Sequence, residues 1–244
     1  MKINLVLLIG LLLCSMSLSA QYQKATEDQK KEIVNKITQA SGNMTTMQCD
    51  FIQVKELSFM DDKVTSEGKM YYKQTNKIRW EYVKPYKYVF SMDGQNVNMT
   101  SGDKTNKVPI KSSKMFGEIS KVMVGGVSGI GLVDSPDFDS QFMVGKDDYQ
   151  IILTPKKKEV KDLFSSVQLY VGKTDSRIRS VELVEKGGDK TTITLKDVKV
   201  NAPIDFKMLK LTRQLTIRYL ANEIYIIFCS FRFISRLLVG GTNC

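Results

Sequence analysis

The chain has 244 residues and a formal net charge of +10, with 36 lysines and arginines against 26 aspartates and glutamates. It contains no histidine, which excludes histidine-based catalytic triads and histidine-ligated zinc. Residues 206–244 hold six basic residues against one acidic residue, so the body at 21–205 is only mildly basic and does not indicate nucleic-acid binding.

The first twenty residues are typical of a secretory signal peptide. Lys2 precedes an apolar run from Leu5 to Leu13, and small residues then lead to a cleavage site after Ala20. The run is too short to span a membrane, which takes about 20 apolar residues. Cys14 raises the alternative of a lipidated signal, but Leu13 stands where a small residue would be expected. The sequence therefore predicts an exported protein.

Residues 26–41 are expected to form the first helix. Thr26 and Gln29 have the spacing of a capping box, and Gly42 is expected to end the helix. Ile33 and Ile37 mark one narrow apolar face. A helix of this kind lies on a surface rather than being enclosed.

The segment 67–90 carries the strongest strand signal. Met70 and Tyr72 alternate with polar residues before a turn at 74–76, and Ile78, Trp80 and Tyr82 do so after it. This predicts an antiparallel hairpin with one aromatic face. Further strands are expected from Met47 toward Phe59 and at 86–92, 97–100, 141–145, 149–154, 165–171, 177–185 and 190–199. About nine or ten antiparallel strands in sequence order predict one large curved sheet.

The segment 113–133 differs from its surroundings. Apolar residues at helical spacing are followed by glycines at 125, 126, 129 and 131. This predicts a short amphipathic helix that ends in a glycine-rich apolar loop placed against the sheet. The glycine run is not a dinucleotide-binding motif, because no buried strand precedes it and no helix opens after it.

Several short motifs resemble the LolA family of periplasmic lipoprotein carriers. They occur in order over about residues 26–206, as Phe51-x-Gln53, Glu67-Gly68-x-Met70, Asn76-x-Ile78-Arg79-Trp80-Glu81-Tyr82 followed by a proline, Asp93-Gly94, Leu153-Thr154-Pro155 and Asn201-x-Pro203-Ile204-Asp205. The resemblance implies a mainly β carrier domain at 21–210, built as an unclosed antiparallel half-barrel. Helices lie as a lid across its concave apolar face.

The same resemblance implies a function in the periplasm. The chain would act as a monomer without a cofactor and receive acylated lipoproteins from an inner-membrane ABC transporter. It would deliver them to the outer membrane, where an acceptor protein is a further expected partner. One position departs from the family, because Gln74 stands where these carriers commonly have an arginine that latches the lid. A neutral amide bonds lid carbonyls more weakly than a guanidinium does.

The acyl chains are expected to lie in a cavity between the sheet and the lid. Methionines suit such a wall because they repack around variable shapes. The candidate lining residues are Phe51, Met70, Tyr72, Ile78, Trp80, Tyr82, Phe90 and Met92 from the sheet, with Ile33, Ile37, Met115, Phe116, Ile119 and Met123 from the helices. A fully packed core is the alternative for each of them, and Cys49 is expected to be a small core residue.

Other readings stay open at this point. Lys30-Lys31 and Lys156-Lys157-Lys158 are either solvated faces or docking surfaces for acidic membranes and transporters. The basic apolar extension at 211–244 is either a membrane-surface helix or a segment without a role in the carrier. An envelope-stress sensor of mislocalised lipoproteins, or another lipid-binding periplasmic protein, is a second function for the same fold. An enzyme is a third, but no nucleophile motif supports it.

Overall fold

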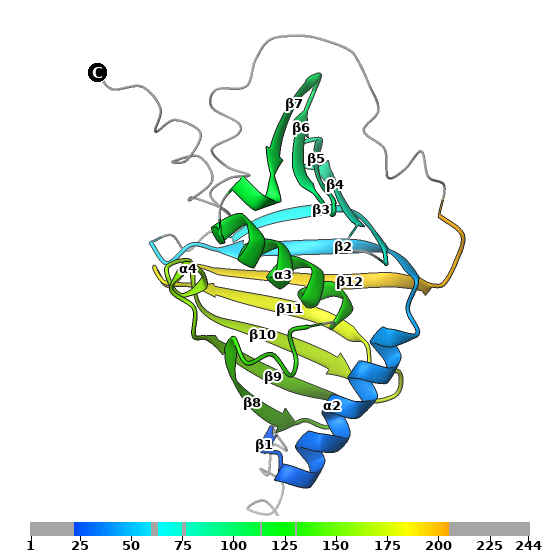
Figure 1. Ribbon diagram of the computed structural model, residues 1–244, viewed down its shortest axis with the longest axis vertical. Coiled ribbons are helices and arrows are strands. Elements are labelled where there is room, and N and C mark those ends of the chain that lie inside the picture. Colours follow the sequence, from blue (N-terminus) through cyan, green and yellow to red (C-terminus); the bar gives the residue numbers. More distant parts are fainter. Residues whose placement is uncertain (1–21, 60–62, 75–76, 113, 130, 205–244) are drawn as a thin grey trace, which may run out of the picture.

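The computed structural model describes residues 22–59, 63–74, 77–112, 114–129 and 131–204, and the expected signal peptide and the 211–244 extension lie outside them. One large antiparallel sheet dominates (Figure 1). Its strands are β1 (Gln23–Lys24), β2 (Thr46–Glu56), β3 (Lys63–Lys73), β4 (Lys77–Lys84), β5 (Tyr88–Asp93), β6 (Asn96–Ser101), β7 (Lys104–Pro109), β8 (Phe138–Val144), β9 (Asp148–Pro155), β10 (Phe164–Gly172), β11 (Ile178–Glu185) and β12 (Lys190–Val200). The helices are α2 (Glu27–Gly42), η1 (Ile110–Ser112), α3 (Lys114–Ser128) and α4 (Lys158–Lys161).

The strand order is β1-β8-β9-β10-β11-β12-β2-β3-β4-β5-β6-β7, so the sheet is open, with β1 and β7 at its edges. The expectation of strands laid down in sequence order was wrong. Two meanders, β2 to β7 and β8 to β12, are joined where the last strand pairs with β2. The expected strand number was also low, because β1 and β7 were missed. The mainly β, unclosed antiparallel fold is confirmed.

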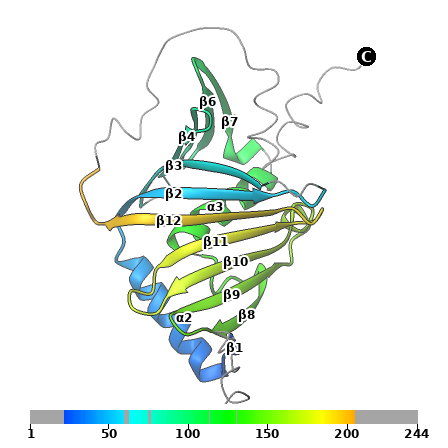
Figure 2. The ribbon, with the colours of Figure 1, turned by 180° about the vertical axis from the view of Figure 1, so that it is seen from behind.

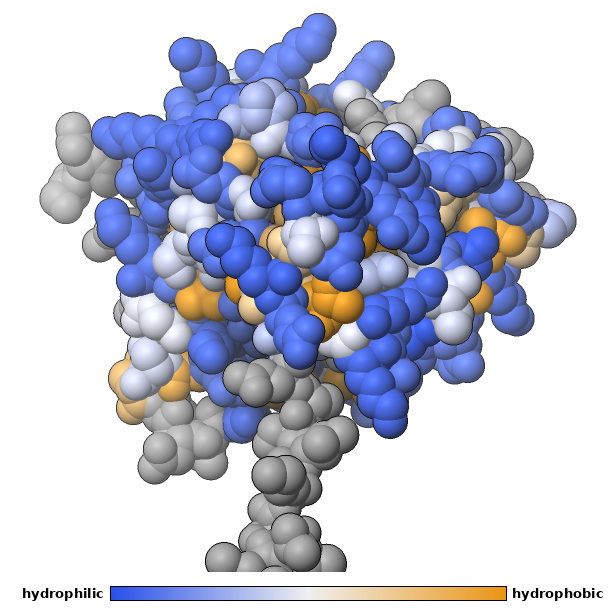
Figure 3. All heavy atoms as spheres, turned by 90° about the horizontal axis from the view of Figure 1, so that it is seen from below, coloured by the Kyte–Doolittle hydropathy of each residue, from blue (hydrophilic) through white to orange (hydrophobic). Residues whose placement is uncertain are grey.

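Both helices of more than four residues lie on one side of the sheet. Figure 1 shows α2 across the lower strands and α3 across β11, β12 and β2, while Figure 2 shows the opposite side of the sheet without a described helix. Seen from below, the surface is mostly hydrophilic and its apolar residues lie in separate patches (Figure 3).

Helix α2 begins as expected. The Thr26 hydroxyl accepts from the Gln29 backbone N–H, and the Gln29 side chain accepts from the Thr26 N–H, which completes the capping box. Its C-cap is Asn43 rather than Gly42, which is the last helical residue. Ile33 and Ile37 are 2% exposed, so the narrow apolar face is fully buried.

Helix α3 is longer than expected, because it continues through Gly125 and Gly126 to Ser128. A Cβ at position 126 would lie 3.7 Å from Val181 on β11, so this glycine faces the sheet at close range. Gly126 thus lies where α3 packs against the sheet. The positive φ values that end a helix come only at Gly129 and Gly131, at 77° and 69°.

The buried apolar residues form two clusters on the concave side. The upper core lies on β2 to β6 and includes Phe51, Met70, Tyr72 and Trp80, with Val124 and Val127 of α3 packed against it. The lower core joins Ile33 and Ile37 of α2 to β8 to β11 and takes in Val122 of α3. Helix α3 thus touches both cores, and the boundary between them runs beneath it.

Candidate functional site

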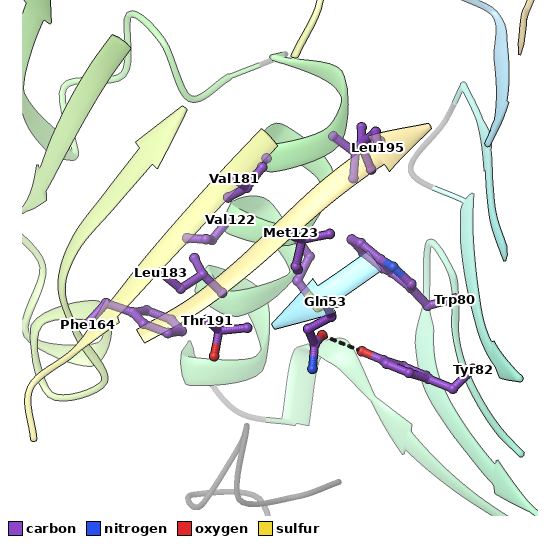
Figure 4. A pocket seen from close by; sticks show the side chains of 13 residues that line it. Gln53, Trp80, Tyr82, Val122, Met123, Phe164, Val181, Leu183, Thr191 and Leu195 are labelled. Atoms are coloured by element: carbon purple, nitrogen blue, oxygen red, sulfur yellow. Dashed lines mark hydrogen bonds between the residues drawn. The ribbon is translucent and has the colours of Figure 1, made fainter. Parts of the chain in front are cut away.

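An apolar cavity of about 50 Å³ lies between α3 and the concave face of the sheet (Figure 4). It occupies the boundary between the two cores, because Trp80 and Val127 belong to the upper core and Val122 and Val181 to the lower one. The sheet contributes Gln53, Trp80, Tyr82, Phe164, Val181, Leu183, Thr191, Ile193 and Leu195, and α3 contributes Val122, Met123, Gly126 and Val127.

The sheet register explains why residues so far apart in sequence meet here. Strand β12 pairs with β2, which brings Leu195 opposite Phe51 and Ile193 opposite Gln53. On the other side of β12, Ile193 lies opposite Val181 of β11. Since alternate residues of a strand face the same side, these pairings place the lining residues of β2, β11 and β12 together on the concave face of the sheet. Helix α3 lies over this part of the sheet.

Four polar side chains interrupt the apolar wall. The Tyr82 hydroxyl donates to Oε1 of Gln53 at 2.9 Å, and burial raises the pKa of Tyr82 well above its usual value. Tyr82 therefore stays neutral and keeps this hydrogen bond at physiological pH. Trp80 Nε1 and Thr191 Oγ1 are also buried, and among the described residues neither has a hydrogen-bond partner.

Three of the residues expected from the sequence line this cavity, namely Trp80, Tyr82 and Met123. The other sheet candidates, Phe51, Met70, Tyr72, Ile78, Phe90 and Met92, are buried in the upper core outside the lining. Ile33 and Ile37 are buried in the lower core, also outside it. The side chains of Met115, Phe116 and Ile119 lie outside the description. A role in ligand binding stays a prediction for all fourteen.

The lining residues of β10 to β12 were not singled out from the sequence. Val181 and Leu183 alternate along one strand, and Thr191, Ile193 and Leu195 along the next, so each strand shows a buried face by itself. The local sequence does not show which strand lies next to β12. Only the pairing of β12 with β2 carries these residues to the aromatic hairpin, and residues about 140 positions apart make that pairing.

Helix α3 is tied to its surroundings near both ends. At its C-terminal end Ser41 of α2 donates a buried hydrogen bond to the Ser128 carbonyl at 2.5 Å. Nearer its N-terminal end, Glu118 pairs with Lys157 at 3.1 Å, and Lys157 also pairs with Asp137 at 2.7 Å. Both hydrogen bonds, with that to Asp137 the stronger influence, raise the pKa of Lys157. One residue of the lysine run is thus a tether for α3.

Gln74 lies exposed in the turn between β3 and β4, where its backbone N–H donates to the Thr45 carbonyl at 2.8 Å. Cys49 is buried in the upper core, as expected. Within the described ranges, no three histidine, cysteine, aspartate or glutamate residues come together as a metal site. In the same part of the chain, no helix has the length and apolar character needed to cross a membrane.

The family model of the outer membrane lipoprotein carrier protein LolA matches residues 42–212. An outer-membrane lipoprotein carrier protein of Chromohalobacter salexigens is 26% identical over 57% of this chain, and the match spans 63% of that relative's length. One from Cupriavidus taiwanensis is 25% identical over 79% of this chain and 86% of its own. The solved LolA superfamily protein of Nitrosomonas europaea aligns with a TM-score of 0.40 at 12% identity, over 74% of this chain and 97% of that one. The matched region contains the aromatic hairpin and the whole cavity lining, and this chain belongs to the LolA family.

Proposed function

We propose that the chain is a periplasmic carrier that binds the acyl chains of lipoproteins beneath α3 and moves them from the inner to the outer membrane. The observation that carries this is an almost wholly apolar cavity on the concave side of an open sheet, covered by one helix. The relatives are named as outer-membrane lipoprotein carriers, which supports the same class of cargo.

The apolar wall supplies the driving force for loading. Each methylene that leaves water contributes about 0.8 kcal/mol, so a multiply acylated cargo is strongly driven into such a site. A cavity of about 50 Å³ is nevertheless a third of the roughly 150 Å³ that holds one benzene molecule in an apolar core. Loading an acyl chain therefore requires α3 to move away from the sheet.

The partners follow from this role. The inner-membrane source is an ABC transporter that releases lipoproteins, and an acceptor at the outer membrane receives them. The missing arginine at position 74 means that closure of the lid depends on other contacts. The Ser41–Ser128 hydrogen bond and the Glu118–Lys157–Asp137 ion pairs are polar contacts that help to hold α3 in place.

A direct test uses the single tryptophan of the sequence, which lies in the cavity wall. A lipid with bromine atoms on its acyl chains quenches indole fluorescence only on contact. We expect the brominated lipid to quench Trp80 and the unbrominated lipid of equal length not to do so. Binding of both lipids without any quenching would place the acyl chains elsewhere.

Two glycines of α3 provide a matched pair of variants. Gly126→Leu puts a bulky side chain against Val181, inside the cavity, whereas Gly117→Leu adds one where nothing lies within 4 Å. Both remove a helical glycine, so both change helix propensity equally. We expect Gly126→Leu to lose acyl-lipid binding and lipoprotein capture, and Gly117→Leu to keep both. Equal binding by the two variants would show that this cavity is not the cargo site.

A further inference from the structure

Two buried polar atoms of the cavity wall have no hydrogen-bond partner among the residues that the structure describes. They are Trp80 Nε1 and Thr191 Oγ1, on side chains that are 5% and 3% exposed. Buried polar groups are almost always paired, because an unpaired one loses its bond to water and gains nothing in return. Two such groups in the wall of one small cavity point to a ligand that supplies the missing partners.

The chemistry of the two atoms defines that partner. The indole N–H of Trp80 only donates, and the hydroxyl of Thr191 has one hydrogen to donate. The other polar pair in the wall, Gln53 and Tyr82, is already joined at 2.9 Å and remains neutral. The Thr191 hydroxyl can also accept, so the wall holds two buried hydrogens, on Trp80 Nε1 and Thr191 Oγ1, that find no acceptor among the described residues.

A hydrocarbon chain has no acceptor to offer, but the linkage that makes it an acyl chain does. Ester and amide carbonyl oxygens are uncharged acceptors with two lone pairs, and they enter an apolar site at far lower cost than a carboxylate or phosphate does. They also sit next to the first methylene, so binding them leaves the hydrocarbon in contact with the apolar wall. An uncharged carbonyl is the group that fits this wall best.

We propose that the cavity recognises the acyl linkage itself, with Trp80 Nε1 and Thr191 Oγ1 each donating a hydrogen bond to an ester or amide carbonyl oxygen of the cargo. This rests on the proposed function and names the group by which the site selects its ligand. The two donors come from opposite sides of β2, since β12 borders β2 directly and β4 lies beyond β3. They accordingly serve different carbonyl groups, which a cargo with more than one acyl linkage provides (Figure 4).

The test compares a di-ester lipid with the di-ether lipid of the same chain length, which lacks carbonyl oxygens. Displacement of a fluorescent fatty-acyl probe gives both affinities without relying on Trp80 emission. We expect the wild-type protein to bind the ester about tenfold more tightly, the ratio that one to two hydrogen bonds support. An isotope-labelled ester carbonyl should also show its infrared stretch shifted to lower frequency in the complex.

Two conservative variants assign the donors. Trp80→Phe keeps an aromatic ring without the N–H, and Thr191→Val keeps the shape without the hydroxyl. Each should weaken ester binding more than ether binding, so that the ratio of the two affinities falls about three- to tenfold. Thr192→Val is the control, because Thr192 is the adjacent residue and lies outside the cavity lining. If Trp80→Phe does not fold, Thr191→Val and the comparison of ester with ether in the wild-type protein still show whether the carbonyl group is recognised.

The outcomes distinguish a failure of this inference from a failure of the proposed carrier function on which it rests. If neither lipid binds, the proposed carrier function fails. If ester and ether bind equally to the wild-type protein, and Thr191→Val changes neither, the cavity binds hydrocarbon alone and the recognition of carbonyl groups is overturned.

Discussion

The ring of Phe51 on β2 lies against Gly68, its partner on β3. A Cβ at position 68 would clash with the Glu81 carbonyl oxygen of β4 and come within 2.6 Å of Phe51 Cζ, so only glycine fits between them. Gly68 is in turn opposite Tyr82 of β4. The Phe51 ring meets Tyr82 edge-on with centroids 5.1 Å apart, and Trp80 at 6.2 Å. The glycine thus lets an aromatic cluster form across three strands beside the cavity.

The first prediction concerns this contact. Gly68→Ala places its Cβ against both the Glu81 carbonyl oxygen and the Phe51 ring, and overpacking of this kind destabilises a core by about 1–3 kcal/mol. Urea unfolding should show that loss, together with a changed Trp80 emission spectrum. Gly187→Ala in the turn between β11 and β12 is the control, because nothing lies within 4 Å of its added Cβ. Equal stability of Gly68→Ala and the wild-type protein would contradict the close packing.

The sequence predicted the local parts of this fold well, because local patterns determine them. The alternation around Met70 and Trp80 predicted a hairpin, and in the structure these two residues are direct partners. The pairing of β12 with β2 was missed because no local pattern encodes which distant strand is adjacent. Strand β7 was missed because it is an exposed edge strand whose residues, Lys104 to Pro109, show no apolar alternation.

The site was only partly predictable for a related reason. An apolar strand face can be read from sequence, but whether helices fill the space above it depends on tertiary packing. Phe51 and Trp80 lie on the same face, yet only Trp80 borders the cavity. Gly126 looked like part of a loop because glycine is a poor helix former. In α3 it lies against Val181 of β11, a contact that the local sequence does not reveal.

The second prediction separates two glycines at the end of α3. Gly126→Ala places its Cβ at ordinary contact distance from Val181, 3.7 Å, and should stabilise the protein by about 0.5–1 kcal/mol through helix propensity. Gly129→Ala must adopt a φ of 77° and brings its Cβ within 2.9 Å of Ser41 Oγ. It should destabilise by about 1–3 kcal/mol. Thermal unfolding of both variants measures the difference, and shifts of equal sign would contradict it.

The third prediction concerns alkaline stability. Burial, with a smaller contribution from Asp50, raises the pKa of Cys49 from 9.0 to about 12. Below pH 9 the thiol is protonated in both states, so its contribution to stability is fully present. Between about pH 9 and 12 the unfolded chain loses this proton first, and stability falls by up to about 1.4 kcal/mol per pH unit.

Cys49→Ala removes this ionisable group. The free energy of unfolding of the variant should therefore fall less steeply with pH, by the contribution of one proton. Urea unfolding between about pH 8.5 and 10.5 tests it, and the variant's loss of packing at position 49 is the same at every pH. Tyr82 and Tyr88 keep their own contributions in both proteins, since burial also raises their pKa values. Parallel curves for variant and wild type would show that the thiol is accessible to solvent.

The last prediction concerns the tether between Lys157 and helix α3. Lys157 joins Glu118 of α3 to Asp137, whereas the neighbouring Lys156 pairs with Asp139, at 2.8 Å, and with no residue of α3 that the structure describes. Lys157→Met therefore frees one end of α3, and Lys156→Met leaves it held. Because these ion pairs are partly exposed, global stability should change by less than about 1 kcal/mol in either variant.

The tether should show itself in the motion of the helix rather than in unfolding. We expect amide hydrogen exchange in α3 to be faster in Lys157→Met than in the wild-type protein, and unchanged in Lys156→Met. Release of a bound acyl lipid should accelerate in the same variant, because α3 must leave the sheet for the chain to escape. Raising the salt concentration should accelerate release from the wild-type protein and have less effect on Lys157→Met, since salt screens this pair. Identical exchange in the two variants would mean that the ion pairs of Lys157 do not hold the helix closed.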